Sequence, residues 1–114
     1  MANIYKNQKQ DLTTNTVTTL YQVPSNSRAI IKSILVCDDT NNGSDITVDL
    51  FNGDPATADK FTIFKNKAIA GNATEQLLSE PLIMQESETL QVTAADANRL
   101  HIVASILEIN REDR

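Results

Sequence analysis

The stretch from Leu20 to Cys37, LYQVPSNSRAIIKSILVC, constrains the fold more than any other part of the chain. A short β-rich run, a proline turn and a long aliphatic run follow one another without interruption. Pro24 holds its own φ at about −65° and drives Val23 into an extended conformation, and the Ser-Asn-Ser sequence after it supplies local turn hydrogen bonds. We therefore expect two strands that pair as a hairpin.

Apolar side chains fall on both sides of the aliphatic run. In an extended strand the two sets are Ile31, Leu35 and Cys37, and Ile30, Ile34 and Val36. A helix could use part of this pattern, but the run is short, rich in β-branched residues and preceded by Pro24, which favours a strand. We expect this strand to be covered on both sides, with Cys37 as a buried, reduced thiol that acts as a small hydrophobe.

Strand signals recur at intervals of about ten residues through the rest of the chain. The run 46–51 alternates, with Ile46, Val48 and Leu50 expected inward, and the run 89–93 does the same with Leu90 and Val92. Turn sequences rich in Asn, Asp, Gly and Pro separate these runs. The pattern predicts an all-β fold, an antiparallel β-sandwich or jelly roll of about eight short strands.

The run 99–109 fits two periodicities. A helical stripe would use Leu100, Val103, Ala104 and Leu107, and a strand would use Leu100, Ile102, Ala104 and Ile106. The β-branched residues and the company of other strands favour the strand.

A chain of 114 residues corresponds to one domain with its own core. We expect an N-terminal arm or edge strand at 1–14, the sandwich at 15–109 and a solvated tail at 110–114. An arm that cannot bury itself often packs on a neighbouring subunit. The candidate interface residues are Ile4, Tyr5 and Lys6 on the arm and Phe51 on an outward face.

Composition argues against several partners. The formal net charge is −5 and the ten basic residues are scattered, which disfavours nucleic acid because no basic stripe is available for phosphate contacts. No apolar run approaches the roughly 18 residues of a membrane span. We expect no membrane partner and synthesis in the cytoplasm.

No constellation of catalytic or metal-binding residues emerges. His101 is the single histidine, so every catalytic set that needs an imidazole would have to use it. The acidic loop that begins at Asp38 fails the calcium-loop pattern, because its twelfth position is Asp49, within a predicted strand. Glu86 and Glu88 lie in a turn, where solvated acids are usual. We predict no catalytic, cofactor or metal residue, and a protein that is not an enzyme.

The runs TLYQVP at 19–24, RAIIKSILV at 28–36 and ITVDL at 46–50 resemble a recurring opening of small virion proteins from tailed bacteriophages, including those of cyanobacteria. The segments 81–94 and 105–109 are similar as well. The resemblance implies a non-enzymatic virion β-sandwich that decorates or stabilises the capsid. Its partners would be other virion proteins, from the major capsid or the tail, and further copies of itself. A tail or collar location remains an alternative that these motifs leave open.

A host-surface module that binds a glycan or receptor is the other alternative. Such a site needs exposed aromatic side chains, and the candidates are Tyr5, Tyr21 and Phe51.

Overall fold

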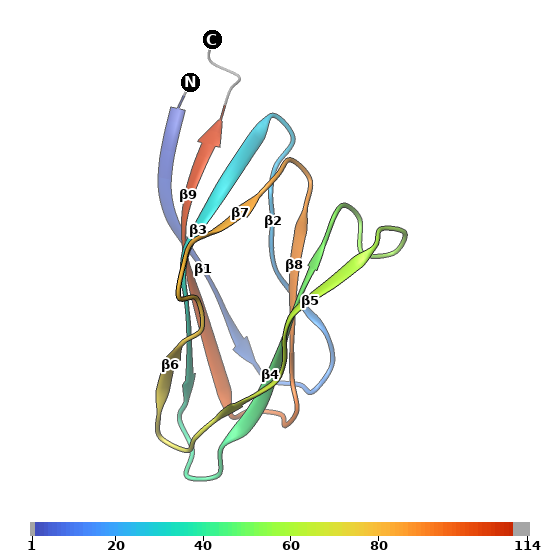
Figure 1. Cartoon of the computed structure of the whole chain (residues 1–114). Helices are drawn as coiled ribbons and strands as arrows, with labels where there is room; N and C mark the ends of the chain where they lie inside the picture. Colours follow the sequence, from blue (N-terminus) through green and yellow to red (C-terminus); the bar gives the residue numbers. More distant parts are fainter. Residues whose placement is uncertain (1, 111–114) are drawn as a thin grey trace.

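The computed structural model describes residues 2–110, and this part of the chain consists of strands joined by turns and loops (Figure 1). The strands are β1 (Ala2–Leu12), β2 (Thr18–Gln22), β3 (Ser27–Asp38), β4 (Ser44–Phe51), β5 (Lys60–Ile69), β6 (Thr74–Gln76), β7 (Leu82–Met84), β8 (Thr89–Ala94) and β9 (Leu100–Asn110). No helix that could span a membrane occurs among these residues.

The strands form two antiparallel sheets that face each other. One sheet has the order β1-β9-β3-β6, with β7 also paired to β3, and the other has the order β2-β8-β4-β5. β7 pairs with Ala29–Ile31 and β6 with Leu35–Cys37, so the two share one strand position beside β3. Because β6 and β7 share one position, the nine strands fill eight positions, four in each sheet. This strand order is that of a jelly roll, which confirms the predicted fold class.

A β-bulge explains why β3 carries apolar residues of both parities. Ile31 pairs with Ile106 and Ser33 with Ser105, so Lys32 is an extra residue opposite β9. The extra residue reverses the alternation: Ala29 and Ile31 face inward before it, and Ile34 and Val36 after it. The prediction that other elements cover both faces of β3 is therefore wrong. The other face of β3 is open to solvent, with Leu35 40% exposed.

Cys37 lies on that outer face and is only partly buried, which corrects the expectation of a buried thiol. The bulge is again the reason, because it turns position 37 away from the core.

The predicted hairpin is also wrong. β2 pairs with β8 and β3 with β9, so the turn after Pro24 carries the chain from one sheet to the other. Val23 continues the β2 side instead: its N–H donates to the carbonyl of Glu88, and its own carbonyl accepts from the N–H of Ser87. β2 and β3 thereby turn their apolar faces to the same core from opposite sheets.

The core lies between the sheets and is almost wholly aliphatic. β9 confirms the strand interpretation of 99–109, since Leu100, Ile102, Ala104 and Ile106 are all buried. The opposite sheet contributes Ile46, Val48, Leu90 and Val92 to the buried core. Leu50 is partly buried and packs against this core.

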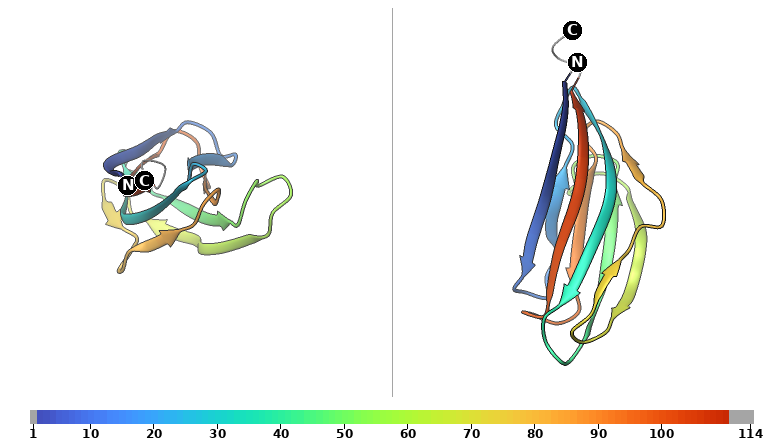
Figure 2. Two further views of the ribbon diagram at one scale, coloured as in Figure 1. Left: turned by 90° about the horizontal axis from the view of Figure 1, so that it is seen from above. Right: turned by 90° about the vertical axis from the view of Figure 1, so that its left-hand side faces the viewer.

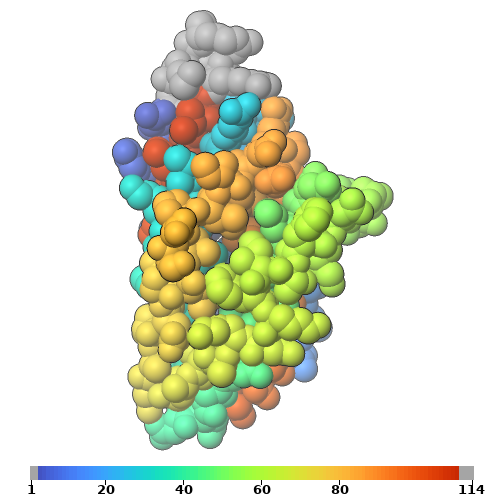
Figure 3. Space-filling view, viewed as in Figure 1, coloured from blue at the N-terminus to red at the C-terminus, as the bar shows by residue number. Residues whose placement is uncertain are grey.

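The domain is elongated, with extents of 50 × 29 × 22 Å. β1, β9 and β3 run side by side along its length, and no other strand lies in front of them in the right-hand view of Figure 2. The outer face of the five-stranded sheet is therefore left uncovered by the rest of the domain. The space-filling view shows a different side of the molecule, the one formed by β5, β6 and β7 (Figure 3).

Candidate functional site

β1 is an edge strand whose free side faces away from the sheet. It pairs with β9 along its whole length, from Ala2 opposite Asn110 to Leu12 opposite Leu100. Alternation places Tyr5 on the outer face, where it is 74% exposed, and places Ile4 and Lys6 on the side of the core. Ile4 remains exposed because it lies near the end of the sandwich. Among the predicted interface residues, Tyr5 and Ile4 are open to a partner.

Lys6 is engaged within the domain. Its Nζ atom lies 3.4 Å from Oε2 of Glu108 and 5.6 Å from the ring centre of Tyr21. The hydroxyl of Tyr21 donates to the same carboxylate oxygen over 2.5 Å. Glu108 occupies the next inward position of β9 after Ile106 and is only 5% exposed. Lys6 therefore supplies the positive charge that a buried carboxylate needs.

The Tyr21 hydroxyl is held in its neutral form. Burial raises the pKa of Tyr21 far above its usual value, and the hydrogen bond to Glu108 and the charge of that carboxylate raise it further. The group works as a hydrogen-bond donor that ties β2 to β9 across the two sheets.

Phe51 does not face solvent, which corrects its predicted outward position. It is 8% exposed at the end of β4. Its partner across the strands is Thr89, which is also buried and whose hydroxyl donates to the carbonyl of Gly53 in the following loop. Phe51 is therefore covered by its own domain, and Tyr21 is buried as well.

The outer face of the five-stranded sheet carries an apolar row that crosses four strands. We define the upper row by direct cross-strand neighbours, Tyr5 on β1, Leu107 on β9, Ile30 on β3 and Ile83 on β7. Ile83 is 63% exposed, and Leu107 and Ile30 are partly buried. Four apolar side chains in contact positions on an exposed face are typical of a surface that another molecule covers.

Two further rows cross the same face. The middle row is polar, with Asn7, Ser105 and Ser33, and the bulge residue Lys32 is exposed next to Ser33. The lower row is Lys9, Val103 and Leu35. Apolar side chains therefore lie on both sides of a central polar row.

The two ends of this face carry opposite charges. Arg28 lies beside Ile109 at the end nearest the upper row, and Asp11 lies beside His101 at the other end. Asp39 adds to the acidic end, since its Oδ2 atom is 3.8 Å from Nε2 of His101.

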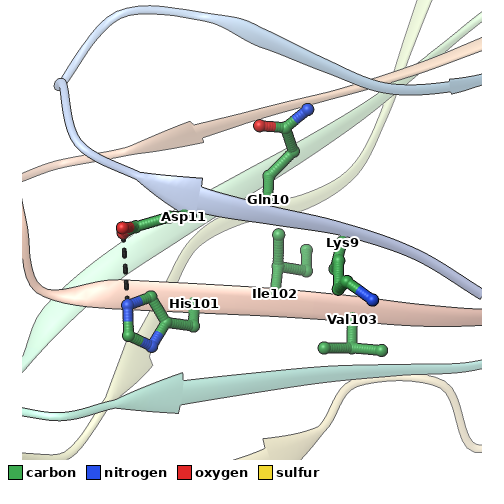
Figure 4. Close-up of a pocket in the computed structure, with 6 residues that line it drawn as sticks. All are labelled: Lys9, Gln10, Asp11, His101, Ile102 and Val103. Carbon is green, nitrogen blue, oxygen red and sulfur yellow. Dashed lines mark ion pairs between the residues drawn. The ribbon is translucent and has the colours of Figure 1, made fainter.

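A shallow hollow of about 250 Å³ lies at the acidic end (Figure 4). Its lining residues are Lys9, Gln10, Asp11, His101, Ile102 and Val103. Asp11 and His101 face each other there, with 3.2 Å between Oδ1 and Nε2. Cys37 is the cross-strand neighbour of His101, but no hydrogen bond between thiol and imidazole is present among the described interactions. A Cys-His catalytic pair requires such a contact.

The acidic loop after β3 is organised by hydrogen bonds. Oδ1 of the buried Asp38 accepts from both the N–H and the hydroxyl of Thr40, at 2.7 Å each. Within residues 2–110, no group of three or more His, Cys, Asp or Glu side chains is placed to hold a metal ion. Asp38 thus stabilises a turn.

Sequence reasoning missed Glu108 and the upper row. Strict alternation along 100–108 places Glu108 inward, so that signal was available. The upper row depends on which strands become neighbours, and no local pattern reports that.

No protein family model and no curated protein matches the chain in sequence. Solved structures are similar in fold. A chain of the T13 particle of infectious bursal disease virus superposes with a TM-score of 0.58 at 11% identity, over 95% of this chain and 31% of that one. The VP2 subviral particle of the same virus gives 0.52 at 10% identity, over 94% of this chain and 32% of that one.

A subunit of the disulfide-linked pili that form Bacillus endospore appendages is similar as well. Its TM-score is 0.52 at 12% identity, over 96% of this chain and 85% of that one. The present chain spans about a third of the length of the viral chains and most of the length of the pilus subunit. At these identities the likeness establishes a shared jelly-roll fold.

Proposed function

We propose that the chain is a non-enzymatic structural subunit of a virus particle, which acts through protein-protein contacts. The observation that carries this proposal is the jelly-roll strand order, shared over 95% of the chain with a subunit of the bursal disease virus particle. The sequence motifs at 19–36 and 46–50, which resemble virion proteins of tailed bacteriophages, support a phage particle as the location.

Contacts with neighbouring virion proteins would use β1 and the outer face beside it. Tyr5 and Ile4 are exposed there, and Tyr5 belongs to an apolar row that its own domain leaves uncovered. Lys6 would act indirectly, because it is engaged by Glu108 and so sets the position of the strand. Phe51 has no part in this proposal, since it is buried.

Decoration or stabilisation of the capsid is the first assignment within this proposal, with a tail or collar location as the alternative. An acidic β-sandwich domain of this size suits repeated placement on a shell. The two locations differ in copy number, because shells repeat a subunit far more often than the closed rings of tails do.

Purified particles provide the test. Particles would be banded in a density gradient, and peptides of this chain would be quantified by mass spectrometry against those of the major capsid protein. An abundant host cytoplasmic protein, measured in the same bands, is the control for contamination. Hundreds of copies would indicate the shell, and on the order of a dozen would indicate tail or vertex. Absence of the chain from washed particles would end the proposal.

The pilus-like alternative meets a chemical obstacle. A filament whose subunits are linked through disulfides needs at least two cysteines in each subunit, because each subunit joins two neighbours. This chain contains one, Cys37. The case for a glycan-binding site is also weaker. Of the three aromatic candidates, Tyr21 and Phe51 are buried and Tyr5 is exposed.

A further inference from the structure

The outer face of the five-stranded sheet is self-complementary, and we infer that two copies of the chain pack these faces together with their strands antiparallel. The inference concerns the free chain and does not depend on a role in a virus particle. It rests on the order of the three rows and on the charges at the two ends.

A two-fold axis that passes through the middle row, perpendicular to the strands, places each strand over its own copy in the reverse direction. The upper row of one copy then lies over the lower row of the other. Leu107 meets the partner's Val103, and Ile30 meets the partner's Leu35. These four side chains thereby gain apolar neighbours, whereas Ile83 lies over the partner's Gln76, the residue of β6 opposite Leu35.

The remaining positions fit the same arrangement. Tyr5 lies over the partner's Lys9, whose aliphatic stem and ammonium group both suit an aromatic face. The middle row meets itself with its small Ser33 and Ser105 side chains, and the exposed Lys32 beside Ser33 extends its ammonium group out of the contact to solvent. Sheets packed with aligned strands generally cross at about −30°.

The charges favour the antiparallel orientation over the parallel one. Arg28 at the basic end lies over the partner's acidic end, where Asp11 and Asp39 flank His101. A parallel arrangement would bring the two acidic ends together. Opposite charges that meet at both ends set the orientation of an interface even where they add little affinity.

The size of the face matches what a stable dimer needs. The 11 paired residues of β1 span about 37 Å at ~3.4 Å each, and four strand positions at ~4.8 Å span about 19 Å. The product is about 700 Å², close to the roughly 800 Å² that each partner contributes to a standard interface.

The molar mass of the recombinant full chain gives the first test. We expect sedimentation equilibrium to show a dimer of twice the 12.6 kDa chain mass. Ile83→Lys adds a charge to the upper row and should weaken dimerisation by about tenfold or more. Phe61→Lys is the matched control, because Phe61 is 54% exposed on β5 in the other sheet. A monomer throughout the concentration range, or equal loss in both variants, would overturn the inference.

Cross-linking tests the register with the chain's own thiol. In the antiparallel arrangement Arg28 lies directly over the partner's Cys37, since both are on the outer face of β3 at equal distance from the middle row. The variant Arg28→Cys should therefore give a covalent dimer with a short bis-maleimide, because sheets packed ~10 Å apart exceed the reach of a disulfide.

Two proteins serve as controls for the cross-link. The wild type has Cys37 alone, and Phe61→Cys adds a thiol of similar exposure elsewhere. Both should remain uncross-linked under conditions that convert most of Arg28→Cys to dimer. Equal yields for Arg28→Cys and Phe61→Cys would reject the proposed register. If the Arg28→Cys variant is itself a dimer by mass but gives no cross-linked product, the register is also rejected, and pairing through the free edge of β1 is indicated.

Discussion

Removal of the Tyr21 hydroxyl should destabilise the domain by about 2 kcal/mol. In Tyr21→Phe the ring keeps its place, so the apolar packing is retained, but the carboxylate of Glu108 loses its 2.5 Å hydrogen bond. Glu108 is buried and keeps only the 3.4 Å contact with Lys6 among its described side-chain partners. Hydrogen bonds to charged groups contribute roughly 1.5–3 kcal/mol.

Thermal and urea unfolding would measure the effect. With an unfolding entropy of about 2.1 cal/mol/K per residue over 114 residues, 2 kcal/mol corresponds to a fall in Tm of about 8 °C. Tyr5→Phe is the control, since the exposed Tyr5 hydroxyl should contribute less than about 0.5 kcal/mol.

A double-mutant cycle separates this hydrogen bond from other effects of the substitution. In a Glu108→Gln background, where the acceptor carries no charge, Tyr21→Phe should cost about half as much or less. A loss below 0.5 kcal/mol in the wild-type background, or the same loss in both backgrounds, would refute the account of Glu108 as a buried, charged acceptor.

Three further results are expected. The folded state raises the pKa of Tyr21 above its unfolded value near 10, so the stability that Tyr21 adds is complete below pH 10 and declines above it. The difference in unfolding free energy between wild type and Tyr21→Phe should therefore shrink by about 1.4 kcal/mol between pH 9 and 11, and an unchanged difference would contradict the assignment. In the Ile83→Lys background, where the chain is expected to be monomeric, Ile34→Ala should cost about 2–5 kcal/mol and its neighbour Leu35→Ala less than about 1, because the bulge turns Ile34 inward; equal losses in urea unfolding would argue against the bulge. Gly71→Ala should cost about 1–3 kcal/mol, since its Cβ would lie 2.6 Å from a neighbouring backbone, whereas Gly53→Ala, with its nearest contact at 3.5 Å, should change the Tm little.

The strand content was predictable because alternation is a local property. Leu90 and Val92 on β8, and Ile102 and Ala104 on β9, follow a period of two that is visible in the sequence and that the buried face confirms. The same period extended to Glu108 would have indicated a buried carboxylate.

The errors arose where a contact with another strand changed the local pattern. The extra Lys32 opposite β9 reverses the faces of β3, and a bulge of this kind leaves no certain mark in a single sequence. The predicted hairpin failed for a related reason. A strand, a turn and a second strand can form a hairpin or connect two sheets, and the choice depends on partners such as β8 and β9, which lie far along the chain.

The sequence alone determined that this chain would form short strands around an aliphatic core, and it excluded a recognisable set of catalytic residues. Only the tertiary structure decided which strands are neighbours. That decision brings Tyr5, Leu107, Ile30 and Ile83 into one row, and it brings Lys6 to Glu108 across 102 positions of the chain. Alternation depends on the geometry of one strand, whereas pairing depends on the free energy of the whole sandwich, so the surface available to a partner appears only once the sheets are assembled.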